Sequence, residues 1–227
     1  MKHLHFDTIS STQDYLIENL EGSPEHFLVS AKHQSKGRGR SSNKWDSFSN
    51  SLAFSFKVAP SKVLTLTSLE IAILLIKFID SEKVKLKWPN DLLSVDLNKC
   101  GGILIQLIDG VAIVGVGLNW GQSVGEEHEE YKTGKGEISS AVLNDTEFET
   151  LPKAIYEFIL QNRMEPSQII TDWNANCVHL GKKVTILDGD DRVDGIFKGI
   201  GPAGEAIIEN NNKELKIYSG SLIINRA

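Results

Sequence analysis

The sequence contains few cysteines and arginines, and each shortage excludes a class of protein. Only two cysteines, Cys100 and Cys177, occur in 227 residues and they stand far apart, which excludes a disulfide framework and a cysteine-spaced metal site. There are five arginines and the formal net charge is −6, so the broad basic surface of a nucleic-acid-binding protein is not expected. Together these features predict a reduced, cytoplasmic protein that does not bind nucleic acid.

Long apolar runs are missing as well. The longest such stretch, Ile71 to Ile79, is interrupted by Lys77 and is too short to span a bilayer. The first seven residues lack the continuous apolar core of a signal peptide. No membrane partner is therefore expected. With 41% hydrophobic residues, the chain can still bury a substantial core.

Periodic apolar residues predict an alternation of strands and helices in the first three quarters of the chain. Strands are expected over residues 4–8, 27–32, 52–58, 84–88, 99–107 and 111–118, and helices over 63–79, 148–162 and 166–176. A further helix should follow Ser11, because Asp14 three residues later completes a capping pair. Asp109-Gly110 predicts a hairpin between the last two strands. Residues 121–136 are polar and acidic and predict a long loop.

The pattern changes beyond Gly181. Five short apolar stretches follow within fifty residues and are separated by glycine, aspartate or asparagine turns, which is typical of a small β-barrel. The sequence thus predicts two domains, residues 1–178 and 179–227.

The most unusual stretch of the sequence is Gly37-Arg38-Gly39-Arg40, which places two of the five arginines beside glycines. Glycine lets the backbone approach a ligand closely, and arginine presents a planar fork to carboxylate or phosphate oxygens. The stretch predicts a loop for an anionic small molecule, although a solvated basic loop or an RNA contact fits it too. Trp45 nearby offers a face on which a base could stack, or a core anchor.

Two glycine clusters interrupt otherwise apolar strands. Gly101 and Gly102 follow Lys99, and Gly115 and Gly117 lie in the next strand. Strand glycines cost stability, so they need an explanation: either tight packing by another element or a ligand that lies on the sheet. Lys99 either reaches solvent or directs a cation at that ligand.

Six motifs together identify a resemblance that no single one establishes. In chain order they are Ser11-Thr12-Gln13, Gln34-x-x-Gly37-Arg38-Gly39-Arg40, Trp45, Lys87-Trp88-Pro89-Asn90-Asp91, Lys99-x-Gly101-Gly102-Ile103-Leu104 and Gly115-x-Gly117-x-Asn119. This order resembles the biotin–protein ligase family, which includes the catalytic part of the bacterial biotin repressor. The similarity extends from near Phe6 to the end of the chain.

The resemblance implies a fold and a reaction. The implied fold is α+β, with a mixed, largely antiparallel sheet packed by helices, as in class II aminoacyl-tRNA synthetases and biotin ligases, followed by a small SH3-like β-barrel. The implied enzyme is a biotin–[acetyl-CoA-carboxylase] ligase. It would use ATP, biotin and Mg²⁺ to form biotinyl-5′-AMP and then transfer biotin to a lysine of a biotin carboxyl carrier protein. The family includes monomers and homodimers, and transcriptional repression is not expected because no DNA-binding segment precedes the motifs.

The resemblance also implies roles for individual residues. Lys99 and Arg40 would be catalytic. Biotin would be bound by Ser11, Thr12, Gln13, Gln34, Gly37, Arg38, Gly39, Arg40, Lys99, Gly102, Gly115 and Gly117. ATP would be bound by Arg38, Arg40, Trp45, Asn90, Asp91, Lys99 and Asn119, with Asp91 as the metal ligand.

The chain departs from the family pattern at a few positions. Gln13 stands where the family commonly has asparagine, Ser41 replaces a third arginine, and Arg226 is a weak match to an arginine that contacts the adenylate. Two other functions compete with the biotin ligase: a lipoate–protein ligase of the same fold, and a nucleic-acid-binding module that would use the Gly-Arg loop.

Overall fold

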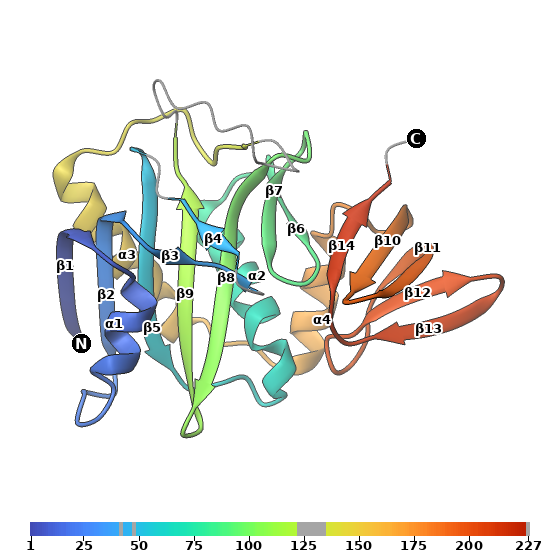
Figure 1. The fold of residues 1–227 in the computed structure, drawn as a ribbon, viewed down its shortest axis with the longest axis horizontal. Helices are drawn as coiled ribbons and strands as arrows, with labels where there is room; N and C mark the ends of the chain where they lie inside the picture. The colour runs from blue at the N-terminus through green and yellow to red at the C-terminus, as the bar shows by residue number, and fades with distance from the viewer. Residues whose placement is uncertain (41–42, 47–48, 122–134, 226–227) are drawn as a thin grey trace.

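The computed structural model describes residues 1–40, 43–46, 49–121 and 135–225, which form a large sheet, a small sheet, a two-stranded ribbon and four α-helices (Figure 1). The large sheet contains β1 (Lys2–Ile9), β2 (Phe27–Gln34), β5 (Ser51–Val58), β6 (Val84–Lys87), β7 (Asp91–Ser94), β8 (Lys99–Ile108) and β9 (Val111–Asn119). The helices are α1 (Thr12–Glu18), α2 (Thr67–Ile79), α3 (Asp145–Gln161) and α4 (Pro166–Ala175), and a 3₁₀ turn, η2 (Leu64–Leu66), precedes α2. The small sheet contains β10 (Lys183–Asp188), β11 (Asp191–Ile200), β12 (Ala206–Asn210), β13 (Lys213–Ile217) and β14 (Ser221–Ile224). A separate ribbon pairs β3 (Gly37–Arg38) with β4 (Lys44–Trp45).

The large sheet has the strand order β1-β2-β5-β9-β8-β7-β6. Only β1 and β2 run parallel, so the prediction of a mixed, largely antiparallel sheet is confirmed. The hairpin between β8 and β9 turns at Asp109 and Gly110, whose φ angles of 49° and 77° are both left-handed. That backbone is the two-residue hairpin turn that an Asp-Gly pair favours.

Helices cover both faces of the large sheet. On one face α1 packs on β2, β5 and β9, and Ser11 caps its first turn by accepting a hydrogen bond from the Asp14 amide. On the other face lie α2 and α3 (Figure 1). Nearly every side chain of α2 from Leu69 to Ile76 is buried, as its all-round apolar pattern predicts.

The small sheet is open. Its five strands confirm the prediction, but their order, β13-β12-β11-β10-β14, leaves β13 and β14 as its two edges and does not close a barrel. Most of β13 is exposed and charged, so it has little apolar surface to fold over β14. The two sheets share one hydrophobic cluster, and the indole N–H of Trp88 donates to the carbonyl of Gly204 at 3.0 Å. The division at residue 178 stays a prediction.

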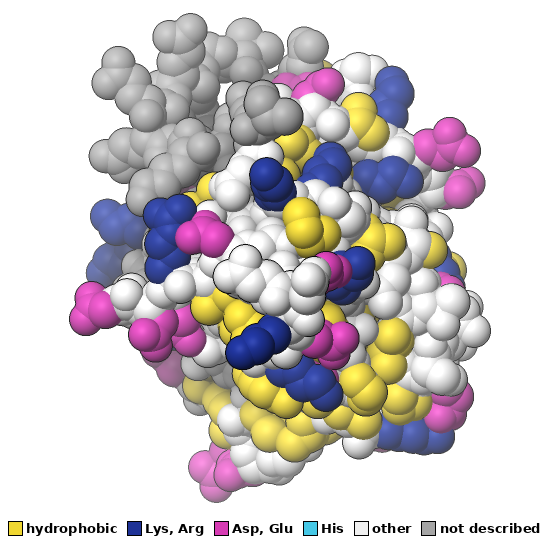
Figure 2. Space-filling view, turned by 90° about the vertical axis from the view of Figure 1, so that its right-hand side faces the viewer, with side chains coloured by type: hydrophobic (Ala, Val, Ile, Leu, Met, Phe, Trp, Pro, Cys, Tyr) yellow, Lys and Arg dark blue, Asp and Glu magenta, His cyan; other side chains and the backbone are white. Residues whose placement is uncertain are grey.

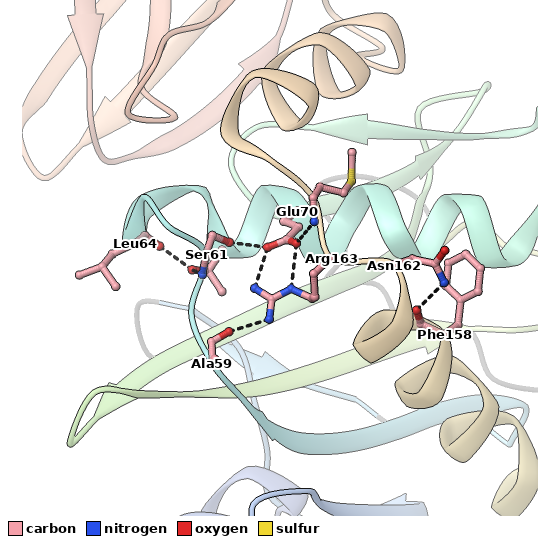
Figure 3. Close-up of polar contacts among 9 residues, drawn as sticks. Ala59, Ser61, Leu64, Glu70, Phe158, Asn162 and Arg163 are labelled. Carbon is pink, nitrogen blue, oxygen red and sulfur yellow. Dashed lines mark hydrogen bonds and ion pairs between the residues drawn. The ribbon is translucent and has the colours of Figure 1, made fainter.

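A buried carboxylate ties α2 to the connection between α3 and α4. Figure 3 shows Arg163 reaching Glu70 with two nitrogens, at 2.8 and 2.9 Å. The Met164 amide and the Ser61 hydroxyl also donate to Glu70, and Arg163 donates to the Ala59 carbonyl at 2.8 Å. Burial alone would raise the pKa of the Glu70 carboxyl, but these donors outweigh it and lower the pKa.

Among the described residues, no helix is long and apolar enough to cross a membrane. Ser41, Arg226 and most of the predicted loop over residues 121–136 lie outside the described residues.

Candidate active site

A cavity lies on the α1 face of the large sheet, beside the β3–β4 ribbon, which crosses in front of β8 and β9 in Figure 1. It holds about 900 Å³ of empty space, including the solvent at its mouth. All of the predicted site residues line it except Gly37 and Asn119. Those that line it are Ser11, Thr12, Gln13, Gln34, Arg38, Gly39, Arg40, Trp45, Asn90, Asp91, Lys99, Gly102, Gly115 and Gly117.

One part of the cavity, which we call the cationic end, is formed by Lys87, Asp91 and Lys99. The Lys99 ammonium lies 2.6 Å from one carboxylate oxygen of Asp91, and the Lys87 ammonium lies 3.1 Å from the other. Burial alone would raise the pKa of the Asp91 carboxyl, but the two positive charges outweigh it and lower the pKa. Two cations and one anion leave this end with a net positive charge.

The arginines of the Gly-Arg loop are held by partners from distant segments. Arg40 donates to the side-chain oxygen of Asn90 at 3.2 Å, and the Asn90 amide in turn donates to the Ile103 carbonyl at 2.6 Å. Arg38 is paired with Asp14, in the first turn of α1. The guanidinium groups of Arg38 and Arg40 therefore line the cavity while each contacts a side chain from another segment, Asp14 and Asn90 respectively.

The surroundings of Asp91 fit a metal ion poorly. Both of its oxygens are in ion pairs with lysines, and the described parts of the chain hold no cluster of three or more His, Cys, Asp or Glu that could bind a metal. Mg²⁺ typically takes one or two carboxylates and the phosphates of its nucleotide, and the ammonium groups here compete for the single carboxylate. The prediction that Asp91 is a metal ligand therefore does not fit its two ion pairs.

The opposite part of the cavity, the neutral end, is formed by Thr12, Gln13, Gln34 and Ser55, all of which are buried. The Thr12 amide and hydroxyl both donate to the side-chain oxygen of Gln34, at 2.7 and 3.0 Å. Because the hydroxyl hydrogen of Thr12 is donated to Gln34, the Ser55 hydroxyl, whose oxygen lies 2.9 Å from the Thr12 hydroxyl oxygen, must be the donor to Thr12. Ser55 then presents its lone pairs as acceptors.

The strand glycines make room for side chains of this protein. A Cβ at Gly117 would overlap the indole of Trp45, and one at Gly115 would stand 2.7 Å from the side-chain oxygen of Gln13. A Cβ at Gly102 would lie 3.4 Å from the Lys99 ammonium. Close packing by another element thus accounts for Gly115 and Gly117, whereas Gly102 would meet only Lys99 of its own strand, at an ordinary contact distance.

The two predicted residues outside the cavity wall have other roles in the structure. A Cβ at Gly37 would overlap the backbone carbonyl of Trp45, so the β3–β4 ribbon requires glycine there. Asn119 is 4% exposed, and its amide donates to the Lys99 carbonyl at 3.0 Å while accepting from Ser51 at 3.3 Å. It supports the backbone that carries Lys99.

The cavity is also lined by residues to which the sequence analysis assigned no role. Lys87 and Ser55 line the cavity, and so do Ser221 and Leu222 from the small sheet. Lys87 begins the Lys-Trp-Pro-Asn-Asp motif, so its place in the sequence was a signal. Nothing local in the sequence marks Ser55 or the β14 residues, because their position depends on strand pairing and on how the two sheets meet.

Family models match most of the described fold. The model of the biotin/lipoate A/B protein ligase family matches residues 5–123, and that of the biotin protein ligase C-terminal domain matches residues 179–224. The chain belongs to the biotin/lipoate A/B protein ligase family.

Relatives in this family resemble the chain over most of its length. The bifunctional ligase/repressor BirA of Salmonella typhimurium is 27% identical over 222 residues, which are 89% of this chain and 68% of that protein. The biotin–[acetyl-CoA-carboxylase] ligase of Mycobacterium tuberculosis is 26% identical over 95% of this chain and 86% of its own length. The structure of the Aquifex aeolicus biotin protein ligase in complex with biotin and ATP is similar to 99% of this chain, with a TM-score of 0.79 and 26% identity.

Proposed function

We propose that this protein is an ATP-dependent biotin–protein ligase. It would form biotinyl-5′-AMP and transfer the biotinyl group to a lysine of a biotin carboxyl carrier protein. The observation that carries the proposal is that one cavity joins a neutral, hydrogen-bonding end to a cationic end. Gly115 lies beside Gln13 and Ser55 of the neutral end, and Gly117 pairs with Gly102, which lies beside Lys99 and Asp91 of the cationic end. Two residues of extended strand span about 7 Å. A ligand with a neutral polar ring and a short acid chain matches that arrangement.

In the first step, a biotin carboxylate oxygen attacks the α-phosphorus of ATP, and the bond to the β-phosphate oxygen breaks to release pyrophosphate. A carboxylate is already ionised at neutral pH, so the step needs no general base. Negative charge spreads over the phosphate oxygens, and cations held in advance stabilise it. Lys99, Lys87 and Arg40, which line the cavity, would stabilise this charge, and Arg38 would join them by leaving Asp14.

In the second step, the neutral amine of a carrier lysine attacks the biotinyl carbonyl and forms the amide bond. The bond from that carbonyl to the phosphate oxygen breaks, AMP leaves with its bonding electrons, and the proton of the amine nitrogen passes to solvent. The carbonyl oxygen becomes negative in the transition state, and the ammonium of Lys99 is the cation we assign to it. The indole of Trp45, which lies over Gly117, would cover the adenine after it shifts from that glycine.

Other parts of the proposal rest on the resemblance to the family. Mg²⁺ would accompany ATP, Asn90 and Asp91 would lie near the nucleotide, and Gly39 would let the loop approach the intermediate. A homodimer and a cytoplasmic location stay predictions, as does the role of Asn119 toward ATP.

A nucleic-acid-binding module is the less favoured function. The arginines of the Gly-Arg loop are engaged with Asp14 and Asn90 beside a cavity. On the face seen in Figure 2, lysines and arginines are interspersed with acidic side chains, where a nucleic-acid-binding surface would be continuously basic.

Biotin-dependent exchange of pyrophosphate into ATP tests the proposed function directly, because it reports the first step without a carrier protein. We expect exchange with biotin and none with lipoate at the same concentration. Exchange with lipoate alone would establish the lipoate ligase, and exchange with neither acid would refute adenylate chemistry at this site.

A further inference from the structure

The neutral end of the cavity contains a hydrogen-bond acceptor that lacks a donor. Gln13 is 3% exposed, and its side-chain oxygen is buried with no hydrogen-bond partner among the described residues. That oxygen stands over Gly115, 2.7 Å from where a Cβ would be, and both residues line the cavity. A buried acceptor left unpaired is costly, so a ligand with a donor would be strongly preferred at this point.

The orientation of the Gln13 amide is determined by two other acceptors. Its nitrogen lies 3.2 Å from the backbone carbonyl of Ile113 and 3.2 Å from the side-chain oxygen of Gln106. A backbone carbonyl only accepts, so the Gln13 nitrogen must face Ile113 and the oxygen points the other way, over Gly115 in the cavity wall. Gln106 accepts the second hydrogen of the same nitrogen and comes from β8, directly across from Ile113 on β9.

The neighbouring groups reinforce the same chemistry. Ser55 pairs with Gly115 across β5 and β9, and its oxygen lies 3.5 Å from the same Cβ position. Because Ser55 donates to Thr12, its remaining capacity is to accept. Two acceptors thus meet over Gly115, and a ring N–H, such as one of the two in a cyclic urea, supplies the donor that they lack.

We propose that Gln106 is a positioning residue for substrate selection: it fixes the Gln13 amide so that the cavity offers an acceptor to a ring N–H of a cyclic urea. Gln106 itself does not line the cavity. The inference rests on the proposed function and goes beyond it, because it assigns the selection of a ring N–H to a residue outside the cavity wall.

The test uses biotin and its two cyclic carbamate analogues, in each of which one ring N–H is replaced by an oxygen of similar size. In ATP–pyrophosphate exchange by the whole chain, we expect one analogue to have a KM about 10–100-fold above that of biotin, because its oxygen would face the Gln13 oxygen. The kcat should change little, since the reacting carboxylate is unaltered.

Two variants then separate positioning from packing. Gln106→Met keeps the length of the side chain and removes one of the two acceptors, so the Gln13 amide is held by the Ile113 carbonyl alone. The KM of the discriminated carbamate divided by that of the other carbamate should then fall at least fivefold at unchanged kcat. Gln106→Glu keeps an acceptor at this position, so the ratio of the two carbamate KM values should stay at its wild-type value. Leu107→Ala, at the exposed next residue of β8, is the matched control and should leave the ratio unchanged.

Each outcome decides something. A wild-type enzyme that accepts both carbamates as well as biotin would overturn the inference without any variant. The inference would also be overturned if the KM ratio were unchanged in Gln106→Met, or if Gln106→Glu did not keep the wild-type ratio. In all these cases the proposed function would stand. Absence of any exchange with biotin in the wild type would refute the proposed function, and the inference with it.

Discussion

Asp91 and Glu70 are two largely buried carboxylates whose pKa values are both lowered, and they occupy different kinds of surroundings. The side chain of Asp91 is 15% exposed in the cavity, and its partners are the flexible ends of Lys87 and Lys99. The side chain of Glu70 is fully buried, and its partners are the fork of Arg163, a hydroxyl and a backbone amide (Figure 3).

The difference shows that a lowered pKa alone does not mark an active site. The donors around Glu70 come from two segments, Ser61 before α2 and Arg163-Met164 after α3, so that cluster holds α2 against the α3–α4 connection. The ammonium groups around Asp91 line a cavity and could exchange the carboxylate for phosphate oxygens. What distinguishes the two sites is whether the partners of the carboxylate are accessible to a ligand.

The variant that should separate the two regions most is Lys99→Ala. Losing the cation assigned to both transition states should lower the kcat of ATP–pyrophosphate exchange about 10²–10³-fold. The fold should persist, because Lys99 is not a member of the shared hydrophobic core and its side chain is 29% exposed. Initial rates of ATP–pyrophosphate exchange measure the loss of kcat, and thermal unfolding measures whether the fold persists.

Lys85→Ala is the matched control for Lys99→Ala. Lys85 lies on β6 two residues before Lys87 and is outside the cavity wall. It should keep full activity. Near-normal exchange in Lys99→Ala would remove that lysine from the mechanism.

Glu70→Gln should have the next largest effect, and on stability alone. The substitution leaves the Arg163 charge without its carboxylate, and breaking such a buried pair costs about 3 kcal/mol of unfolding free energy. The kcat/KM of the folded protein should not change, because Glu70 does not line the cavity. Urea denaturation at pH 7 and exchange activity at low temperature measure the two quantities. A fall in kcat/KM at unchanged stability would reverse the comparison between the two carboxylates.

Asp91→Asn should produce a smaller change, this time in rate. Without the carboxylate, Lys87 and Lys99 lose the anion that holds them, and kcat should fall about tenfold, in the range that a charge-assisted hydrogen bond contributes. Stability should change little, because both ammonium groups can reach solvent. An unchanged or higher kcat would mean that Asp91 only competes with the nucleotide for the lysines.

The sequence was sufficient wherever the signal was local. Alternating apolar residues predicted most of the strands of the large sheet, and Asp109-Gly110 predicted its hairpin, because side-chain period and turn chemistry act over a few residues. Strand β7 was missed, since Asp91 was read as the end of a turn. The resemblance to the family correctly predicted that most of these site residues lie together, and all of them except Gly37 and Asn119 line the cavity.

Partners far apart in the chain could not be predicted. Glu70 and Arg163 are separated by 93 residues, and neither has a local pattern that points to the other. The same holds for Trp45 over Gly117 and for Gln106 beside Gln13. In the site, the residue types were predictable, but their orientations depend on strand register and on contacts between elements.

The smallest expected effect is in the acid stability of Glu70→Gln. Folding lowers the pKa of Glu70 below its ordinary value of 4.5, so on acidification this carboxylate binds a proton more readily in the unfolded chain than in the folded one. Acid therefore lowers the free energy of unfolding. The contribution of Glu70 is therefore complete above about pH 4.5 and is lost as the pH falls through the folded pKa. The wild type should lose up to about 1.4 kcal/mol per pH unit more than Glu70→Gln in that range, so the two stabilities should converge. Urea denaturation from pH 7 to pH 3.5 measures this, and a gap that stays constant would show that Glu70 stabilises the fold by shape and not by charge.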